Sequence, residues 1–285
     1  MIQQKTVKEF KIDNGIGLHS GKIAKLRFLP AEENSGIVFR RIDLAEKPEI
    51  KATFGNVVDT KNSTNLGFDG KMYVRTIEHL MCALYMFGID NAIIEIDNEE
   101  MPIFDGSASK FIEVFKKQTL VEQKAPKNLL KIKKEISFTD DNGNIVSIKP
   151  KETGLKVNFE IIFPSPIVGH QIFSEEINQD VFENEIMDSR TFCEKYQVDY
   201  LQSIGLAKGG SLENAVVLDG DKILNPGGLR HEKECVNHKV LDIIGDLYTS
   251  GHQVVGEISA AKTGHFHTNQ LLHKVFADKN NYEII

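Results

Sequence analysis

The stretch TIEHLMCALYMFGID, residues 76–90, decides the fold. Its apolar residues recur at intervals of three and four, at Ile77, Leu80, Met81 and Leu84. Side chains at that spacing share one face of a helix. Gly88 follows the apolar run, and a glycine in that place is typical of a helix C-terminus. The stretch therefore predicts an amphipathic helix that packs into a core.

Strands are expected on the N-terminal side of this helix. Apolar residues alternate with polar ones at Ala24, Leu26 and Phe28, and again at Ile37 and Phe39. A period of two is typical of half-buried strands. We expect these strands to form an antiparallel sheet.

On the C-terminal side the pattern continues as strand and helix. NAIIEID, residues 91–97, indicates a buried strand. Ser107 is a candidate N-cap for a second helix in FDGSASKFIEVFKK, residues 104–117. The polar stretch KKQTLVEQKAPK, residues 116–127, is interpreted as a linker.

The second half of the chain repeats this order. A hairpin is predicted in ISFTDDNGNIVSI, residues 136–148, and a strand in LKVNFEIIF, residues 155–163. CVNHKVLDIIGDLYTSG, residues 235–251, then predicts a helix, and HQVVGEISA, residues 252–260, predicts a strand. The last helix is expected to begin near Thr268.

The recurrence of helix, strand and helix predicts an α+β fold of two related domains, residues 1–126 and 127–285. Each domain would be a sheet packed on two helices, with the active site between the domains. A length of 285 residues exceeds the usual size of one hydrophobic core, which agrees with this division. His79 and His238 both lie near the start of corresponding helices.

Composition excludes several classes of protein. The net charge is −7 and the pI is about 5.8, which argues against general nucleic-acid binding, because such binding neutralises many phosphates. The sequence shows no leader pattern and no apolar run that approaches a membrane span. Cys82, Cys193 and Cys235 are far apart, without the spacing of a disulfide scaffold or a cysteine zinc site. We expect a cytoplasmic protein.

The predicted helix at residues 235–251 carries a polar stripe that suits a metal site. His238 and Asp242 are four residues apart, so they project from one face, and Asp246 continues the stripe. On spacing alone, the polar face of a surface helix is the more common explanation, so the spacing does not establish a metal site. In the first helix Glu78 and His79 are adjacent and diverge by about 100°, so they cannot both ligate one ion. Glu78 is therefore a candidate base or, alternatively, an acid that favours the helix N-terminus.

Two further motifs have ambiguous roles. AAKTGHFHTNQ places His265 and His267 after a predicted strand, in a loop position where either could be reactive. GIGLHSGK, residues 15–22, suggests a phosphate-binding loop, but Ile16 and Ile23 stand where that motif requires glycine and a hydroxyl residue.

Six blocks together resemble the signature blocks of the UDP-3-O-acyl-N-acetylglucosamine deacetylase family, in the same order. They are TIEHLMCALYMFGIDN, MPIFDGSASKF, SRTF, GGSLENAVV, GLRHEKECVNHKVLDIIGDL and KTGHFHTNQ. The resemblance implies a zinc-dependent hydrolase that removes an acetyl group from a UDP-linked acylated amino sugar in lipid A biosynthesis. One catalytic Zn²⁺ is implied as the cofactor, and the oligomeric state is not specified.

The resemblance also implies roles for individual residues. The zinc ligands would be His79, His238 and Asp242. Glu78 would be the general base, His265 the proton donor to the leaving amine, Asp246 the residue that holds His265, and Thr191 a donor to the oxyanion. The substrate-binding candidates are Lys239 and Lys262 for the polar end, Phe192 and residues 204–217 with Gly210 for the acyl passage, and Leu18 and His19 near the mouth.

Ser63 departs from the family pattern, because many members carry a cysteine there, and we expect no loss of activity from the change. The alternative enzyme is a zinc amidohydrolase acting on another acylated amino sugar. A catalytically silent metal-binding scaffold is the alternative outside enzymes, and the presence of Glu78 and His265 argues against it.

Overall fold

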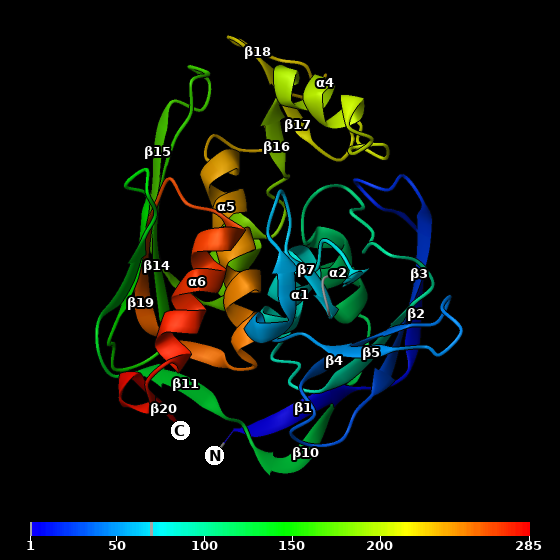
Figure 1. The fold of residues 1–285 in the computed structure, drawn as a ribbon, viewed down its shortest axis with the longest axis vertical. Coiled ribbons are helices and arrows are strands. Elements are labelled where there is room, and N and C mark those ends of the chain that lie inside the picture. The colour runs from blue at the N-terminus through cyan, green and yellow to red at the C-terminus, as the bar shows by residue number, and fades with distance from the viewer. Residues whose placement is uncertain (1, 69–70) are drawn as a thin grey trace.

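The computed structural model describes residues 2–68 and 71–285. It has an α+β fold in which two outer sheets enclose two pairs of helices (Figure 1). The helices beside the first sheet are α1 (Glu78–Phe87) and α2 (Ser109–Phe115), and those beside the second are α5 (Glu234–Leu247) and α6 (His265–Phe276). No helix in the described part of the chain has both the length and the apolar composition needed to cross a bilayer.

The first half forms a five-stranded sheet in the order β2-β3-β9-β4-β5. Its strands are β2 (Phe10–Ile16), β3 (Ile23–Pro30), β4 (Ile37–Arg41), β5 (Glu49–Lys51) and β9 (Ala92–Ile96). The central strand β9 is antiparallel to β3 but parallel to β4, so the prediction of an antiparallel sheet is wrong for one pair. Alternation of apolar residues reports which face is buried and carries no information about strand direction.

The second half repeats this strand order as β12-β13-β19-β14-β15. Its strands are β12 (Ile136–Thr139), β13 (Ile145–Lys149), β14 (Leu155–Ile162), β15 (His170–Ile177) and β19 (Gln253–Ala261), extended by β11 (Leu129–Ile132) and β20 (Tyr282–Ile284). Like β9, β19 is antiparallel to one neighbour, β13, and parallel to the other, β14. The two halves therefore share one topology, as the recurrent pattern predicts.

Shorter elements connect and extend the two large sheets. They are the strands β1 (Gln3–Val7), β6 (Val57–Asp59), β7 (Asn65–Phe68), β8 (Lys71–Val74), β10 (Leu120–Pro126), β16 (Phe192–Glu194), β17 (Val216–Asp219) and β18 (Lys222–Ile223), and the helices α3 (Gln179–Val181) and α4 (Lys195–Ser203). β16, β17, β18 and α4 form the segment at the top of Figure 1, residues 192–223, which is called the α4 segment below. It contains residues 204–217, which are predicted to line an acyl passage.

The predicted linker is partly a strand. β10 pairs antiparallel with β1, so it closes the first half onto its own N-terminus. None of its side chains is fully buried, which explains why the sequence shows no apolar periodicity there. The five-stranded sheet of the first half lies before β10 in the sequence, and the strands of the second-half sheet follow it. The division at residues 126 and 127 stays a prediction, because one contiguous apolar core runs through both halves.

Two predicted helix starts need correction. α6 begins at His265 rather than near Thr268, so His265 is not a loop residue. The residue before it is Gly264, which lacks the side-chain acceptor that marks most helix starts. In α2 the N-cap is Ala108 rather than Ser107, although the Ser107 hydroxyl accepts a hydrogen bond from the Ser109 amide at 3.1 Å.

The packing of α5 against α1 positions the two halves. Gly245 of α5 lies so close to α1 that a Cβ there would overlap the carbonyl oxygen of Glu78. The same Cβ would come within 3.1 Å of the Cys82 amide nitrogen. Because both neighbours are backbone atoms inside a buried helix, no side-chain rotation relieves the overlap. A glycine is therefore required for this helix crossing.

Gly245→Ala is expected to lower the free energy of unfolding by about 1–3 kcal/mol or more, since the helices must separate to admit the methyl group. Urea denaturation measures this loss. The matched control is Gly227→Ala, where a new Cβ meets open space, and that change should stay within ~0.5 kcal/mol. Equal stability of the two variants would contradict the proposed packing constraint.

Candidate metal centre and active-site cleft

Helices α1 and α5 bring three potential metal ligands together. His79 comes from the first turn of α1, and His238 and Asp242 come from one face of α5. Their ligand atoms all lie within 4.8 Å of one another, and all three residues are buried. The distance to Asp242 Oδ1 is 3.7 Å from His79 Nε2 and 3.4 Å from His238 Nε2. The predicted ligand set therefore meets across the two halves of the chain.

The environment of these residues orients two of them. The Nδ1 of His238 donates to the backbone carbonyl of Ser189 at 2.9 Å, which leaves its Nε2 free to accept. Lys239 Nζ donates to Asp242 Oδ2 at 2.7 Å, so the other carboxylate oxygen faces the histidines. His79 Nδ1 is buried without a hydrogen-bond partner among the described residues.

The protonation states of the three candidate ligands also suit the binding of a cation. Burial lowers the pKa of His79 to about 3, and the neighbouring His238 acts in the same direction. Burial lowers the pKa of His238 as well. Burial disfavours the charged form of Asp242, but His238 and Lys239 outweigh it and hold its pKa well below the usual range. Two neutral imidazoles and an ionised carboxylate are ligands that Zn²⁺ takes in catalytic sites.

Beside these candidate ligands, Glu78 and His265 form a buried carboxylate–imidazole pair. Glu78 Oε1 lies 3.9 Å from His265 Nε2, and Glu78 Oε2 accepts from the Thr64 amide at 2.9 Å. On its other side the His265 ring donates from Nδ1 to Asp246 Oδ2 at 2.8 Å. Asp246 Oδ1 accepts from the Thr64 hydroxyl at 2.6 Å. Thr64 thus donates hydrogen bonds to both Glu78 and Asp246, the two carboxylates that flank His265.

The pKa values of this pair are shifted in the same direction by different causes. Burial raises the pKa of Glu78 to about 8, although the nearby His265 acts to lower it. Burial opposes charge on His265, but the carboxylate of Asp246 outweighs it and raises the pKa to about 9. His265 is therefore protonated at neutral pH and able to donate a proton from Nε2.

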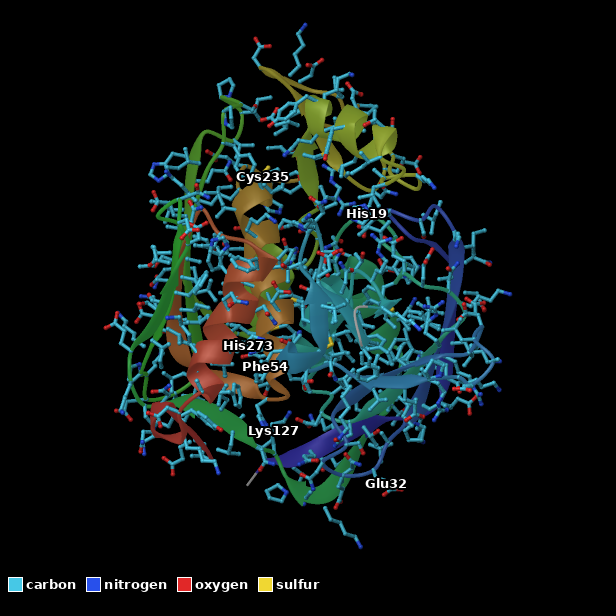
Figure 2. All side chains as sticks on the ribbon, viewed as in Figure 1. His19, Glu32, Phe54, Lys127, Cys235 and His273 are labelled. Atoms are coloured by element: carbon cyan, nitrogen blue, oxygen red, sulfur yellow. The ribbon has the colours of Figure 1, made fainter. Side chains whose placement is uncertain are left out.

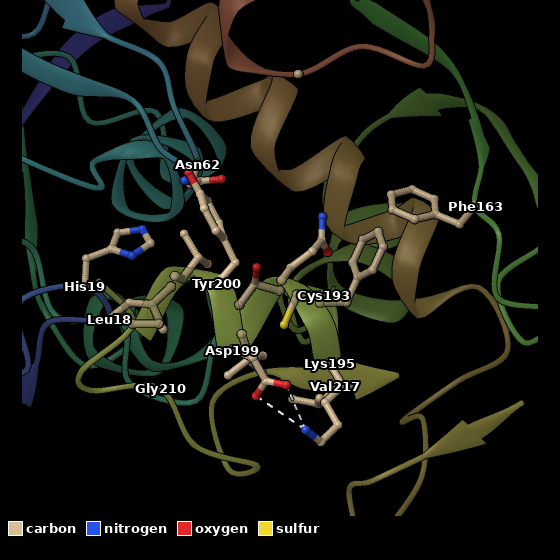
Figure 3. A pocket seen from close by; sticks show the side chains of 18 of the residues that line it. Leu18, His19, Asn62, Phe163, Cys193, Lys195, Asp199, Tyr200, Gly210 and Val217 are labelled. Carbon is tan, nitrogen blue, oxygen red and sulfur yellow. Dashed lines mark hydrogen bonds and ion pairs between the residues drawn. The ribbon is translucent and has the colours of Figure 1, made fainter. Parts of the chain in front are cut away.

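A cavity of about 790 Å³ opens next to this pair. Its lining includes seven of the individual residues that the resemblance assigns to catalysis or substrate binding: Leu18, His19, Thr191, Phe192, Gly210, Lys239 and His265. Apolar side chains of the α4 segment form much of the remaining wall. Figure 3 shows Leu18 and His19 opposite Phe163, with the Lys195–Asp199 ion pair at the α4 end. The cavity is thus lined by His265 and Lys239 together with many apolar side chains.

Three other residues named from the sequence, His19, His267 and Lys262, lie in different environments. His19 is 3% exposed, and neither ring nitrogen has a partner among the described residues. Figure 2 places it between the first sheet and the α4 segment. His267 also lines the cavity, but its Nε2 pairs with Asp140 at 3.1 Å, which favours His265 as the reactive histidine. Lys262 is exposed at the end of β19, and its role stays a prediction.

Sequence reasoning missed Thr64 and Ser189. Thr64 lies next to Ser63, which is buried and donates its hydroxyl to Asn65 at 3.0 Å. The surrounding TKNSTNLG has no periodicity that would single Thr64 out. Ser189 acts through its backbone carbonyl, so its side-chain identity gives no signal. Only the SRTF block, quoted for Thr191, pointed to this segment.

The fold and the site define a class: an α+β enzyme with a candidate metal centre between its two halves and a buried carboxylate–histidine pair beside it. The comparisons give the family. The model of the UDP-3-O-acyl N-acetylglycosamine deacetylase family matches residues 4–277, and this chain belongs to that family.

Three relatives named UDP-3-O-acyl-N-acetylglucosamine deacetylase are similar over the whole chain. The protein of Shewanella violacea is 45% identical over 287 residues, which cover 100% of this chain and 93% of the relative. That of Nitratiruptor sp. is 45% identical over 285 residues, with 100% and 94% covered. That of Aliarcobacter butzleri is 42% identical over 284 residues, with 100% and 93% covered.

Asp246→Asn is expected to lower the pKa of His265 in the metal-free protein by about 1–3 units, because the change removes the carboxylate that stabilises the imidazolium. NMR titration of the His265 ring measures this, starting from a midpoint near 9. Asp140→Asn is the matched control, since Asp140 bonds His267 instead. An unchanged His265 midpoint in the Asp246 variant would show that Asp246 does not set its charge.

Proposed function

We propose that this chain is a zinc-dependent hydrolase that removes the N-acetyl group from UDP-3-O-(3-hydroxyacyl)-N-acetylglucosamine and so commits this sugar to lipid A biosynthesis. The observation that carries the proposal is the meeting of His79 with His238 and Asp242, directly beside Glu78 and His265. Family membership and the printed names of the relatives supply the substrate.

One Zn²⁺ fits the ligand set, because two imidazole nitrogens and a carboxylate oxygen leave a position open. When bound, such an ion supplies a Lewis acid that acidifies water and polarises an amide carbonyl. Its positive charge also favours the ionised form of a nearby carboxylate. Glu78, whose pKa is raised to about 8 in the metal-free protein, chiefly by burial, would then be ionised and basic at neutral pH.

The protein residues manage the protons. Glu78 takes a proton from the attacking water as the new carbon–oxygen bond forms. His265, charged and held by Asp246, gives its Nε2 proton to the sugar nitrogen as the carbon–nitrogen bond breaks. The products are acetate and a free amine. General acid–base groups of this kind each contribute about 10²–10⁴-fold to rate.

The cavity wall positions the substrate. Thr191 lines the cavity and lies two residues after Ser189, which contacts the ligand His238. Its hydroxyl would donate to the developing oxyanion. Lys239 would receive the polar end of the substrate, and Phe192, Gly210 and the α4 segment would enclose the acyl chain. Leu18 and His19 would lie at the entrance.

The proposal also includes a two-domain arrangement and a cytoplasmic location. Residues 1–126 supply Glu78 and His79, and residues 127–285 supply the other ligands and the proton donor, so two domains would share one site. Cys82, Cys193 and Cys235 are free, which is the usual state in a reducing cytoplasm.

Chelator-treated protein is expected to release no acetate from UDP-3-O-(3-hydroxyacyl)-N-acetylglucosamine, and one equivalent of Zn²⁺ should restore release. Glu78→Gln should lower kcat by about 10²–10⁴-fold, since it removes the base. It should still bind zinc, because Glu78 is not one of the three ligands. Glu95→Gln on β9 is the control and should keep wild-type activity.

Substrate arms separate the proposal from the alternative enzyme. The same protein is assayed with UDP-N-acetylglucosamine that lacks the 3-O-acyl chain and with other acylated amino sugars. Strong preference for the 3-O-acyl substrate supports the proposal. Zinc binding without acetate release from that substrate contradicts it, and release from another amino sugar would support the alternative hydrolase.

A further inference from the structure

A buried ion pair lies behind the metal centre. Arg190 Nε donates to Glu234 Oε1 at 2.7 Å, and Arg190 Nη2 donates to Glu234 Oε2 at 3.2 Å. The two side chains are 9% and 0% exposed. A paired guanidinium and carboxylate have a two-pronged geometry that fixes orientation as well as distance. The contact is therefore well suited to hold two chain segments in one relative position.

This ion pair joins the segment before β16 to the first turn of α5. Glu234 is the first residue of α5, and its carboxylate also accepts from the Arg190 amide at 3.0 Å and the Arg230 amide at 2.7 Å. Arg190 Nη2 donates in addition to the Gly228 carbonyl at 2.8 Å. Glu234 thus accepts hydrogen bonds from Arg190, before β16, and from the Arg230 amide, before α5. A shift of the Arg190 segment relative to α5 would break several of these bonds.

The same segment contacts the metal centre on the adjacent residue. Ser189 immediately precedes Arg190, and its carbonyl oxygen accepts from His238 Nδ1 at 2.9 Å. His238 lies four residues after Glu234, one turn along the same face of α5. The Arg190–Glu234 pair and the Ser189–His238 bond are therefore successive links between the same two segments.

Thr191 follows on the other side of Arg190. Its amide donates to the Gly106 carbonyl and its carbonyl accepts from the Val216 amide, both at 2.8 Å. Residues 189–191 are thus fixed by backbone hydrogen bonds at one end and by the ion pair in the middle. This order places the Ser189 carbonyl toward α5 and Thr191 at the cavity wall.

We propose that the Arg190–Glu234 ion pair is a positioning device for the metal centre. It holds residues 189–191 against the first turn of α5, so that the Ser189 carbonyl fixes the His238 ring with Nε2 toward the other ligands. Neither Arg190 nor Glu234 belongs to the candidate ligand set or lines the cavity. The inference rests on the proposed metal-binding function of His79, His238 and Asp242.

The alternative is a purely structural pair that adds stability without affecting the ligands. The two cases differ in metal affinity. Partners that orient a metal ligand typically contribute about 10–100-fold to metal affinity or activity. A structural pair changes the free energy of unfolding and leaves the affinity of the folded protein unchanged.

The test variant is Arg190→Gln combined with Glu234→Gln, which removes both charges and leaves no unpaired buried ion. Its matched control is Arg40→Gln combined with Glu95→Gln, a partly buried ion pair at 2.9 Å on the five-stranded sheet. The zinc dissociation constant is measured by chelator competition on full-length metal-free protein. The absorption spectrum of the Co²⁺-loaded protein reports the ligand geometry, and urea unfolding reports stability.

The Arg190/Glu234 variant is expected to bind zinc about 10–100-fold more weakly and to change the cobalt spectrum. The Arg40/Glu95 control should keep the wild-type zinc affinity and cobalt spectrum, whatever its stability. Arg190→Lys keeps a positive charge paired with Glu234 but loses the two-pronged contact of the guanidinium. This variant should therefore fold and should show a smaller loss of zinc affinity.

If a folded Arg190/Glu234 variant keeps wild-type zinc affinity, the positioning role is wrong and the proposed function is unaffected. The same holds if the Arg40/Glu95 control loses zinc affinity to an equal extent. A wild-type chain that binds no zinc overturns the proposed function and the inference with it. Loss of affinity confined to the Arg190 variants supports the positioning role.

Discussion

Gly245 of α5 lies directly against the backbone of α1, and a Cβ at that position would overlap the carbonyl oxygen of Glu78. Both helices carry site residues at this crossing. Glu78 is followed by His79, and Gly245 stands between Asp242 and Asp246 on α5. The separation of the two helix backbones therefore sets the separation of the candidate ligands. Because the ligands meet within 4.8 Å, a wider crossing would leave His79 out of reach of the other two.

The buried charges on α5 depend on partners that this packing brings to them. Asp242 accepts from Lys239, while Asp246 accepts from His265 and Thr64. A buried carboxylate without a hydrogen-bonding partner costs free energy, so each of these acids depends on its partners. The partners come from α5 itself, from α6 and from the loop before β7. The Glu78–His265 pair and the candidate metal ligands are thus two parts of one buried polar network that spans both halves.

Local periodicity predicted the elements that carry the site. The spacing of Ile77 to Leu84 predicted α1, and the four-residue spacing of His238, Asp242 and Asp246 placed these residues on one face of α5. The meeting of α1 with α5 is a contact between residues about 160 positions apart. The recurrence of the helices in the two halves only suggested it, and the family resemblance supplied the ligand set. The roles of Ser189 and Thr64 were not predictable, because backbone groups and one isolated hydroxyl leave no spacing. The start of α6 was missed because Gly264 gives no capping signal, although that start places His265 in a rigid first turn.

The most direct measurement is a crystal structure of the zinc-loaded protein with anomalous scattering recorded at the zinc absorption edge. The account predicts one strong anomalous peak bonded to His79, His238 and Asp242, with zinc–ligand distances of about 2.0–2.2 Å. Glu78 and His265 should face the open side of that ion. A peak bonded to other residues, or a zinc-loaded crystal without a peak between α1 and α5, would contradict the account.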